Sequence, residues 1–306
     1  MARGGYAWWY VDALSDDGRH GLSIIGFVGS VFSPYYAGAR RRSPRGVADP
    51  LSHCAMNVAL YGPGRNRWAM TERGRGRVQR SATSIGIGPS SMRWERDALV
   101  IEIDEVTAPI PSRLRGVVRV HPHALVDHSF ALDDAGRHRW HPIAPCARVE
   151  VALTHPACTW RGGGYLDSNA GDRPLENDFA RWDWSRAALA RGRTAVLYDV
   201  ARRGAAPLEL TLCFDPAGGM STFEAPQRVA LATTGWRLPR GTRSDAQRPA
   251  SVATTLESAP FYARSVVDTS LLGEPGRAMH ESLSLDRFDT RWCQWMLPFR
   301  MPRTGG

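Results

Sequence analysis

The sequence has no lysine, so all 39 of its basic residues are arginine, against 30 acidic residues and a formal net charge of +9. A protein that binds nucleic acid would gather such residues on a recognisable module. The densest cluster, arginines 40–42 with Arg45, lies beside Ser43-Pro44 and predicts a loop instead. We therefore expect a solvated surface and no nucleic-acid partner, with attraction to anionic lipid head groups as the alternative.

Long apolar runs are also missing. The longest, residues 22–32, is interrupted by Gly26 and Gly29 and falls short of the roughly 20 residues that a membrane-spanning helix needs. The N-terminus shows no apolar region of a signal peptide. The five cysteines lie far apart without a C-x-x-C spacing, which argues against a disulfide framework or a zinc knuckle. We expect a cytoplasmic protein with buried or incidental thiols.

Short segments of alternating polarity, separated by Gly, Pro and Asp turns, dominate the chain. Residues 8–11 and 22–28 flank the turn signal Asp16-Asp17-Gly18 and predict a β-hairpin. The same period-two pattern recurs at 99–103, 115–120, 196–200 and 208–214. Helix is expected only for a turn or two at 174–179.

The fold class predicted from this pattern is all-β. Many short strands favour barrels or sandwiches, and a chain of 306 residues would need two of them. The run Gly171-Asp172-Arg173-Pro174 breaks the pattern near residue 175. We therefore predict an N-terminal domain over 1–175 and a C-terminal domain over 176–306.

Two motifs have a functional and a structural interpretation. His121 and His123, with His128 nearby, could place imidazoles on one metal ion, but a proline separates the first two and no matching carboxylate is close in sequence. We favour a polar loop after Val120 and expect no metal. The glycines 162–164 lack the Lys-Ser/Thr of a P-loop, so a tight turn or a close backbone approach is the preferred interpretation.

Aromatic and acidic residues concentrate between 138 and 184. In extended strands Tyr165 and Asp167 share one face, and so do His138 and Trp140. Two such pairs facing one cavity would supply an acid, a polar group and aromatic faces. The same segment holds three more tryptophans, the candidates for substrate contact: Trp160, Trp182 and Trp184. Core packing explains such a cluster equally well, and the residues alone leave both interpretations open.

A catalytic cluster of this kind could support cation chemistry without nicotinamide, flavin or metal. A carboxylic acid in an apolar pocket is driven toward its neutral form, which can donate a proton. Aromatic faces stabilise an adjacent cation by roughly 0.5–2 kcal/mol per ring. Protonation of a carbon–carbon double bond and capture of the cation by water is one reaction that such a site permits, although the residues do not select it over other polyene chemistry. No G-x-S-x-G nucleophile motif occurs.

Several segments, in order along the chain, resemble the carotenoid 1,2-hydratases, also called hydroxyneurosporene synthases. They are GGYAWWYVDA (4–13), GSVFSPYY (29–36), HCAMNVALY (53–61), RWAMTER (67–73), GYLDSN (164–169), WDW (182–184) and LPFRMPR (297–303). Individually some are short, but together they extend from end to end.

The resemblance implies two lipocalin-like β domains and addition of water across the terminal 1,2 double bond of acyclic carotenoids such as neurosporene and lycopene. The products lie on the route to spheroidene or spirilloxanthin in purple phototrophic bacteria. The essential acid of the family falls on Asp167, with Tyr165 before it, and its essential His and Trp fall on His138 and Trp140. No cofactor is implied.

The family resemblance also implies peripheral association with the cytoplasmic side of the inner or photosynthetic membrane, where carotenoids dissolve. The chain begins almost directly at the GGYAWWYVDA segment, so attachment here would be in doubt if relatives attach through an N-terminal extension. A carotenoid- or lipid-binding carrier without turnover is the alternative function, and it would not need Asp167. No obligate protein partner is expected.

Overall fold

A computed structural model describes residues 2–64 and 66–304. Contacts between Cα atoms divide the chain into two compact units, one formed by residues up to Pro174 together with those from Gln294 onward, and one formed by Leu175–Cys293. The predicted second domain extended to residue 306, whereas these contacts group the residues from Gln294 onward with the first unit. The reason is local: Glu72 N–H donates to Pro302 O at 2.9 Å, and Thr304 N–H donates to Glu72 O at 3.0 Å.

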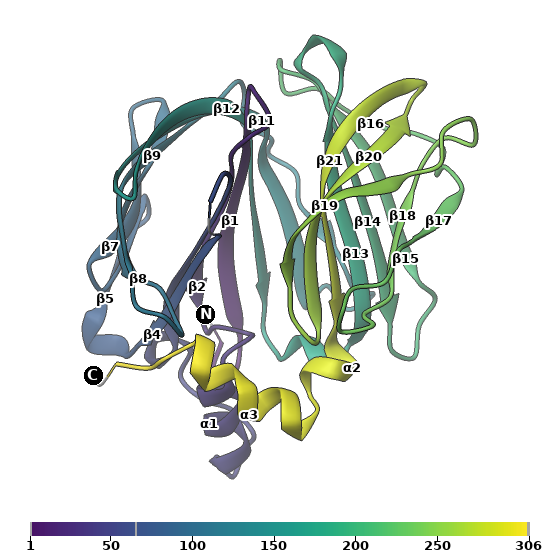
Figure 1. The fold of residues 1–306 in the computed structure, drawn as a ribbon. Coiled ribbons are helices and arrows are strands. Elements are labelled where there is room, and N and C mark those ends of the chain that lie inside the picture. Colours follow the sequence, from purple (N-terminus) through teal and green to yellow (C-terminus); the bar gives the residue numbers. More distant parts are fainter. Residues whose placement is uncertain (1, 65, 305–306) are drawn as a thin grey trace. The chain divides into compact units, whose positions relative to one another are not determined.

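The first unit is built on one antiparallel sheet, ordered β4-β3-β2-β1-β12-β11-β9-β8-β7-β6-β5 within the described residues, with β10 pairing to β11 (Figure 1). The sheet curls until its distant parts meet, since Ala108 N–H, just after β8, donates to Trp68 O of β4 at 3.3 Å. Its strands are β1 (Tyr6–Ser15), β2 (Gly21–Val28), β3 (Cys54–Tyr61), β4 (Arg67–Arg73), β5 (Val78–Arg80), β6 (Ser84–Ile87), β7 (Ser90–Glu95), β8 (Ala98–Val106), β9 (Arg113–Pro122), β10 (Phe130–Ala131), β11 (His138–His155) and β12 (Ala157–Gly171).

Alternation along these strands separates two faces. Val11, Leu166 and Ile101 belong to a large buried apolar cluster on the inner face of the curled sheet. The neighbours of Leu166 in β12, Tyr165 and Asp167, therefore point to the other face. That outer face of β1, β12 and β11 carries the candidate site.

The second unit has a seven-stranded antiparallel sheet, ordered β16-β15-β14-β13-β21-β20-β19, and a two-stranded sheet β17-β18, within the described residues. Its inner face is partly polar, because Asp183 accepts hydrogen bonds from Arg228 at 2.7 Å and Ser282 at 2.5 Å. The strands are β13 (Phe179–Ala188), β14 (Thr194–Arg202), β15 (Leu208–Phe214), β16 (Met220–Thr222), β17 (Arg228–Leu231), β18 (Arg240–Arg243), β19 (Ser251–Ser258), β20 (Tyr262–Leu271) and β21 (Glu274–Ser284).

The all-β prediction is confirmed, as are the hairpin β1–β2 and strands β8, β9, β14 and β15. The glycine run 162–164 lies inside β12 and makes a close backbone approach. A Cβ on Gly162 would come within 1.9 Å of Leu14 O, and one on Gly164 within 2.2 Å of Val149 Cγ2. These glycines thus serve strand packing between β1 and β11, as the structural interpretation predicted.

The prediction of a loop at arginines 40–42 is wrong and two short helices went unpredicted, whereas the turn predicted at 174–179 is confirmed by a 3₁₀ turn at Leu175–Asn177. Those arginines form the last turn of α1, which begins with Ser33 capping the N–H groups of Tyr35 and Tyr36 and with Pro34 in the first turn. Both are helix-start signals that the turn-like Ser43-Pro44 obscured. The helices are α1 (Pro34–Arg42), α2 (Leu285–Phe288) and α3 (Arg291–Arg300), with short 3₁₀ turns η1 (Pro50–Ser52), η2 (Arg75–Arg77), η3 (Leu175–Asn177) and η4 (Ala190–Gly192).

Helix α3 was not predicted for two reasons. It is apolar nearly all round, so it lacks the polar face of an ordinary surface helix, and it contains Pro298. In the described part of the chain, no helix is both long and apolar enough to cross a membrane.

Candidate active site

Trp140, Tyr165 and Asp167 meet on the outer face of the first unit's sheet. Tyr165 and Asp167 lie two residues apart on β12, and Trp140 comes from the adjacent strand β11. The indole N–H of Trp140 donates a hydrogen bond to Asp167 Oδ2 at 2.7 Å, and the Tyr165 hydroxyl donates to the same oxygen at 2.9 Å. Trp140 and Tyr165 are fully buried, and Asp167 is 4% exposed. The carboxyl group and its two donors are therefore held together away from bulk water.

A second buried carboxyl group, Asp12, lies across from this acid on β1. In the β1–β12 register Asp12 pairs with Tyr165, and Tyr10 pairs with Asp167. The Tyr10 hydroxyl donates to Asp12 Oδ2 at 3.0 Å, and the Tyr10 and Tyr165 rings meet edge to face with centroids 6.3 Å apart. Tyr165 thus lies between two carboxyl groups.

His138 lies beside this cluster, in contact with Tyr6. Its Nδ1 forms a hydrogen bond of 2.8 Å with the Tyr6 hydroxyl, and its backbone N–H donates to Asp133 Oδ1 at 2.8 Å. Gly171 makes the pairing possible, because a Cβ there would lie 2.5 Å from the Tyr6 ring and 2.7 Å from His138 Nδ1. His138 is fully buried and shares its face of β11 with Trp140, two residues along.

Burial dominates the electrostatics of the cluster. Desolvation raises the pKa of Tyr165 well above its usual range, and the neighbouring negative charges of Asp167 and Asp12 raise it further. The Tyr165 phenol therefore keeps its proton at physiological pH and acts as a hydrogen-bond donor to Asp167. The cluster therefore holds a carboxyl group among aromatic rings, away from bulk water.

Comparison with known proteins identifies the family to which the chain belongs. The family model "Carotenoid hydratase CrtC" matches residues 24–306. The chain belongs to the CrtC carotenoid hydratase family. It is 57% identical to the acyclic carotenoid 1,2-hydratase of Thiocapsa roseopersicina over 99% of this chain and 74% of that protein, and 52% identical to that of Rubrivivax gelatinosus over 98% and 74%. The resemblance found in the sequence is confirmed, and so is the prediction of a hydro-lyase.

The fold of the CrtC-family chain is also known from more distant proteins. A crystal structure from Nitrosomonas europaea, described as an AttH protein, aligns with a TM-score of 0.63 at 15% identity and covers 92% of both chains. This likeness concerns the fold alone, which is all-β and lipocalin-like.

Of the three tryptophans predicted to contact substrate, one lies in the first unit with the acid and two lie in the second unit. Trp160 packs against the apolar cluster inside the first sheet and stacks on His20 with ring centroids 6.2 Å apart, so it faces away from Asp167. Trp182 and Trp184 are buried on β13 of the second unit, where Trp182 contacts the Tyr198 ring edge to face at 6.1 Å. Their role in substrate binding stays a prediction.

The predicted histidine motif has other partners, and His128 is linked to the site through Phe130, whose ring centroid lies 5.4 Å from that of Trp140. His121 is the ninth residue of β9, with Nε2 3.9 Å from Glu150 Oε2, and the His128 ring contacts Phe130 at 4.6 Å. Among the described residues, no group of three or more His, Cys, Asp or Glu side chains has a geometry that could hold a metal ion.

Sequence reasoning missed the contribution of β1 in this CrtC-family protein. Tyr6, Tyr10 and Asp12 lie within the GGYAWWYVDA segment, for which the sequence predicts a strand and a family signature but no site residue. Their period-two spacing is the signal that could have found them, because it places aromatic and acidic side chains on one face of a strand. Their position opposite β12 required the register of the sheet.

Proposed function

We propose that this protein adds water across the terminal 1,2 double bond of acyclic carotenoids such as neurosporene and lycopene. Relatives at 57% and 52% identity are named acyclic carotenoid 1,2-hydratases. The observation that carries the proposal is the Asp167 carboxyl group, buried among aromatic rings and held by Trp140 and Tyr165. An apolar polyene end and a proton donor can meet there without bulk water.

In the first step, Asp167 acts as general acid. Because Oδ2 already accepts two hydrogen bonds, the proton of the neutral acid is carried on Oδ1. The π electrons of the 1,2 double bond form a new bond between C2 and this proton, and the electron pair of the O–H bond stays on the carboxylate. The tertiary carbon C1 becomes cationic.

In the second step, water is captured. The cation at C1 is stabilised by the faces of Trp140 and Tyr165, and by the negative charge that Asp167 has just acquired. A lone pair of water bonds to C1, and the water then returns a proton to the Asp167 carboxylate. His138, two residues from Trp140 on the same face, orients the water. The product is a tertiary alcohol, and the acid is regenerated.

Two opposing effects set the protonation of Asp167. Burial disfavours the charged carboxylate, whereas hydrogen bonds from Trp140 and Tyr165 favour it. The same two donors stabilise the carboxylate in the transition state, when it loses its proton, so they assist the step once the neutral acid is formed. We propose that burial prevails and that Asp167 is neutral in the resting enzyme.

The proposed substrate dissolves in lipid, so we also propose that the enzyme works at the surface of the membrane that holds it. This would place the protein peripherally on the cytoplasmic side of the inner or photosynthetic membrane. No cofactor, nucleic acid or obligate protein partner enters the proposal.

The decisive experiment incubates the purified protein with lycopene dispersed in detergent and follows the product by chromatography and mass spectrometry. A product heavier by one water, absent with Asp167→Asn, supports the hydratase. Lycopene that is bound, as shown by a shifted absorption spectrum, but recovered unchanged after long incubation with wild-type protein would contradict it and favour the carrier.

A further inference from the structure

Helix α3 (Arg291–Arg300) presents large apolar side chains to solvent. We call four of them the aromatic stripe, because they follow the spacing i, i+3, i+4, i+7 that places residues on one side of a helix. They are Trp292, Trp295, Met296 and Phe299, with exposed fractions of 49%, 79%, 42% and 75%. Contiguous exposed apolar surface of this kind marks an interaction site in most soluble proteins.

The exposure of the stripe does not result from an unpacked helix. On the opposite side of α3, Cys293 is 1% exposed and Leu297 7%, and Met301 just beyond the helix is 5% exposed. A helix that is apolar on both sides is expected to be covered on both sides. On the stripe side, Trp292 stacks on the Trp236 ring with centroids 6.4 Å apart. Trp295 and Phe299 remain largely exposed among the described residues.

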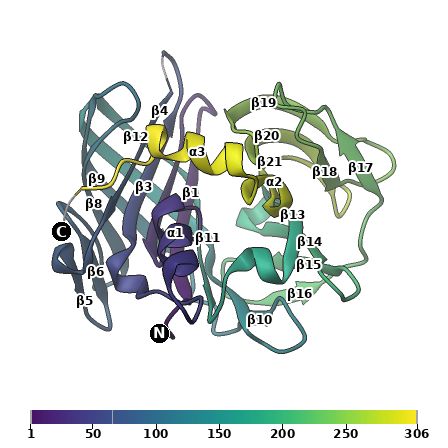
Figure 2. The ribbon, with the colours of Figure 1, turned by 90° about the horizontal axis from the view of Figure 1, so that it is seen from below.

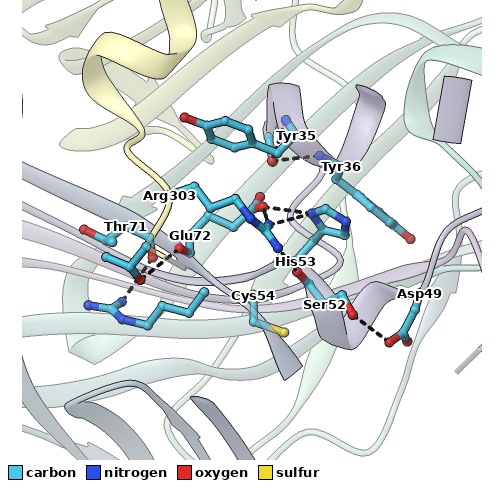
Figure 3. A network of polar contacts seen from close by, with 12 residues as sticks. Tyr35, Tyr36, Asp49, Ser52, His53, Cys54, Thr71, Glu72 and Arg303 are labelled. Carbon is cyan, nitrogen blue, oxygen red and sulfur yellow. Dashed lines mark hydrogen bonds and ion pairs between the residues drawn. The ribbon is translucent and has the colours of Figure 1, made fainter. Parts of the chain in front are cut away.

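The segment after α3 is fixed by a buried polar network (Figure 3). Arg303 forms an ion pair with Glu72, which also accepts a hydrogen bond of 2.8 Å from His53 Nδ1, and Arg303 Nη2 donates to Ser52 O at 3.0 Å. Glu72 is only 2% exposed. The Arg300 guanidinium also lies over the Trp68 ring, 4.4 Å from its centroid. These contacts anchor the C-terminal end of the helix, and the aromatic stripe faces solvent.

Arginines lie at the same end of the first unit. Figure 1 and Figure 2 both show α1 near the C-terminal part of α3, and Arg303 lies over the Tyr35 ring of α1 at 6.0 Å. Arg41 and Arg42 at the end of α1, with Arg45 just beyond, are exposed. In the part of the chain that the structure describes, α1 has no acidic residue to offset them.

We propose that the aromatic stripe of α3 and the α1 arginines form a docking surface for an anionic lipid bilayer. Aromatic and long apolar side chains insert at the boundary between head groups and acyl chains, while arginines bind the phosphates above it. The partner rests on the proposed function, since a carotenoid substrate is delivered from a membrane. The location of the surface rests on the exposed residues alone.

Charge distinguishes a bilayer from a second copy of the chain. A symmetric pair formed through the stripe would bring the arginines of both copies together and add like-charge repulsion. An anionic bilayer instead supplies opposite charge at the same level as the arginines. The surface therefore fits anionic lipid better than self-association.

The test measures binding to sedimenting vesicles of phosphatidylcholine alone and of phosphatidylcholine with phosphatidylglycerol. Trp295→Ser/Phe299→Ser should lower the partition coefficient by at least about tenfold on mixed vesicles. Arg41→Gln/Arg42→Gln should lower it by about tenfold to thirtyfold on mixed vesicles and leave it unchanged on neutral ones. Matched control variants are Leu125→Ser/Ile110→Ser, at apolar side chains 60% and 56% exposed, and Arg19→Gln/Arg119→Gln, at exposed arginines.

The possible outcomes test the docking surface and the proposed hydratase function separately. Stripe variants that lose vesicle binding but still hydrate lycopene dispersed in detergent support the proposal. Stripe variants that bind like wild type, or controls that lose as much, overturn it. A wild-type dimer that the stripe variant converts to monomer, with no vesicle binding by either, also overturns it. If wild-type protein does not hydrate lycopene but its vesicle binding depends on the stripe, the docking surface stands and the proposed function fails.

Discussion

The indole N–H of Trp140 donates its hydrogen bond to Oδ2 of Asp167 at 2.7 Å, so the ring and the acid act as a unit. The same oxygen accepts the Tyr165 hydroxyl at 2.9 Å. Any change at Trp140 therefore alters two properties, the aromatic face near the substrate and the hydrogen bonding of the acid. Substitutions that separate these properties are the informative ones.

Replacing the acid by its amide should nearly abolish hydration while leaving the fold intact. Asp167→Asn keeps the shape of the side chain and an oxygen that can accept from Trp140 and Tyr165, but it removes the transferable proton. A positioned general acid contributes about 10²–10⁴-fold, so kcat should fall by that factor. The rate of lycopene hydration in detergent measures it, with circular dichroism to check folding. Asp127→Asn, at an exposed carboxyl group, is the control, and full activity in Asp167→Asn would refute the assignment.

Trp140→Phe and Trp140→Ala separate hydrogen bonding from cation stabilisation. Phenylalanine retains an aromatic face but cannot donate to Asp167, whereas alanine loses both and leaves a cavity at a fully buried position. We expect kcat to fall about tenfold for phenylalanine and by a further factor of ten or more for alanine. Measured kcat values, compared at equal folded fraction, check this. Equal losses would mean that the indole hydrogen bond to Asp167 alone contributes, because phenylalanine keeps the aromatic face that alanine loses.

Much of the fold and the centre of the site could be predicted because strands have a local signature. The alternation at 99–103 or 208–214 depends only on neighbouring residues, and so does the shared face of Tyr165 and Asp167. The meeting of Trp140 with Asp167 was anticipated as two pairs facing one cavity. What the sequence lacked was the pairing of β11 with β12, which brings Trp140 to Asp167. His138 instead contacts Tyr6, and its part in the site stays a prediction.

The remaining features depend on long-range geometry. Asp12 contributes through β1, more than 150 positions away from Tyr165, its partner in the register. Trp160 lies on the same strand as Asp167 yet faces the interior, because side chains alternate along β12 and the two residues are an odd number of positions apart. Helix α3 violates ordinary amphipathic patterning, which is expected where a surface has a partner.

Tyr165→Phe should move the pH dependence of the reaction. The phenol keeps its proton over the accessible range, because burial raises the pKa of Tyr165 well above its usual value, so its hydrogen bond to Asp167 favours the carboxylate. Removing that donor makes the carboxylate less favourable and the neutral acid more favourable. The neutral acid then persists to higher pH. The alkaline limb of the kcat profile therefore moves to higher pH, while the maximal kcat falls.

The measurement is kcat for lycopene hydration between pH 5 and 10, with Tyr61→Phe, at a buried tyrosine elsewhere in the first unit, as the matched control. A shift toward lower pH would mean that the ionised form of Asp167 acts, and that the proton comes from another group. An unshifted profile would mean that the hydrogen bond does not influence the acid.

The last prediction concerns the stability contributed by His280, a residue of the second unit. His280 is 1% exposed, and burial, with the positive charges of Arg240 and Arg228, lowers its pKa from 6.5 to about 3. In the unfolded chain, His280 therefore binds a proton below about pH 6.5. In the folded chain, it binds that proton only near pH 3. Stability from this residue is fully present above pH 6.5 and is lost as the pH falls toward 3.

Between pH 7.5 and pH 5.0 this linkage should cost about 2 kcal/mol of unfolding free energy, measurable by urea titration at both values. The nearby carboxyl group of Asp183 acts with the opposite sign, because burial raises its pKa and acidification favours its folded form. His280→Asn removes the histidine and retains a polar side chain that can reach Ser282, the partner of Nε2 at 3.1 Å. Between pH 7.5 and pH 5.0, the unfolding free energy of His280→Asn should therefore decrease by about 2 kcal/mol less than that of the wild-type protein. Parallel losses in both proteins would show that His280 accepts a proton while folded.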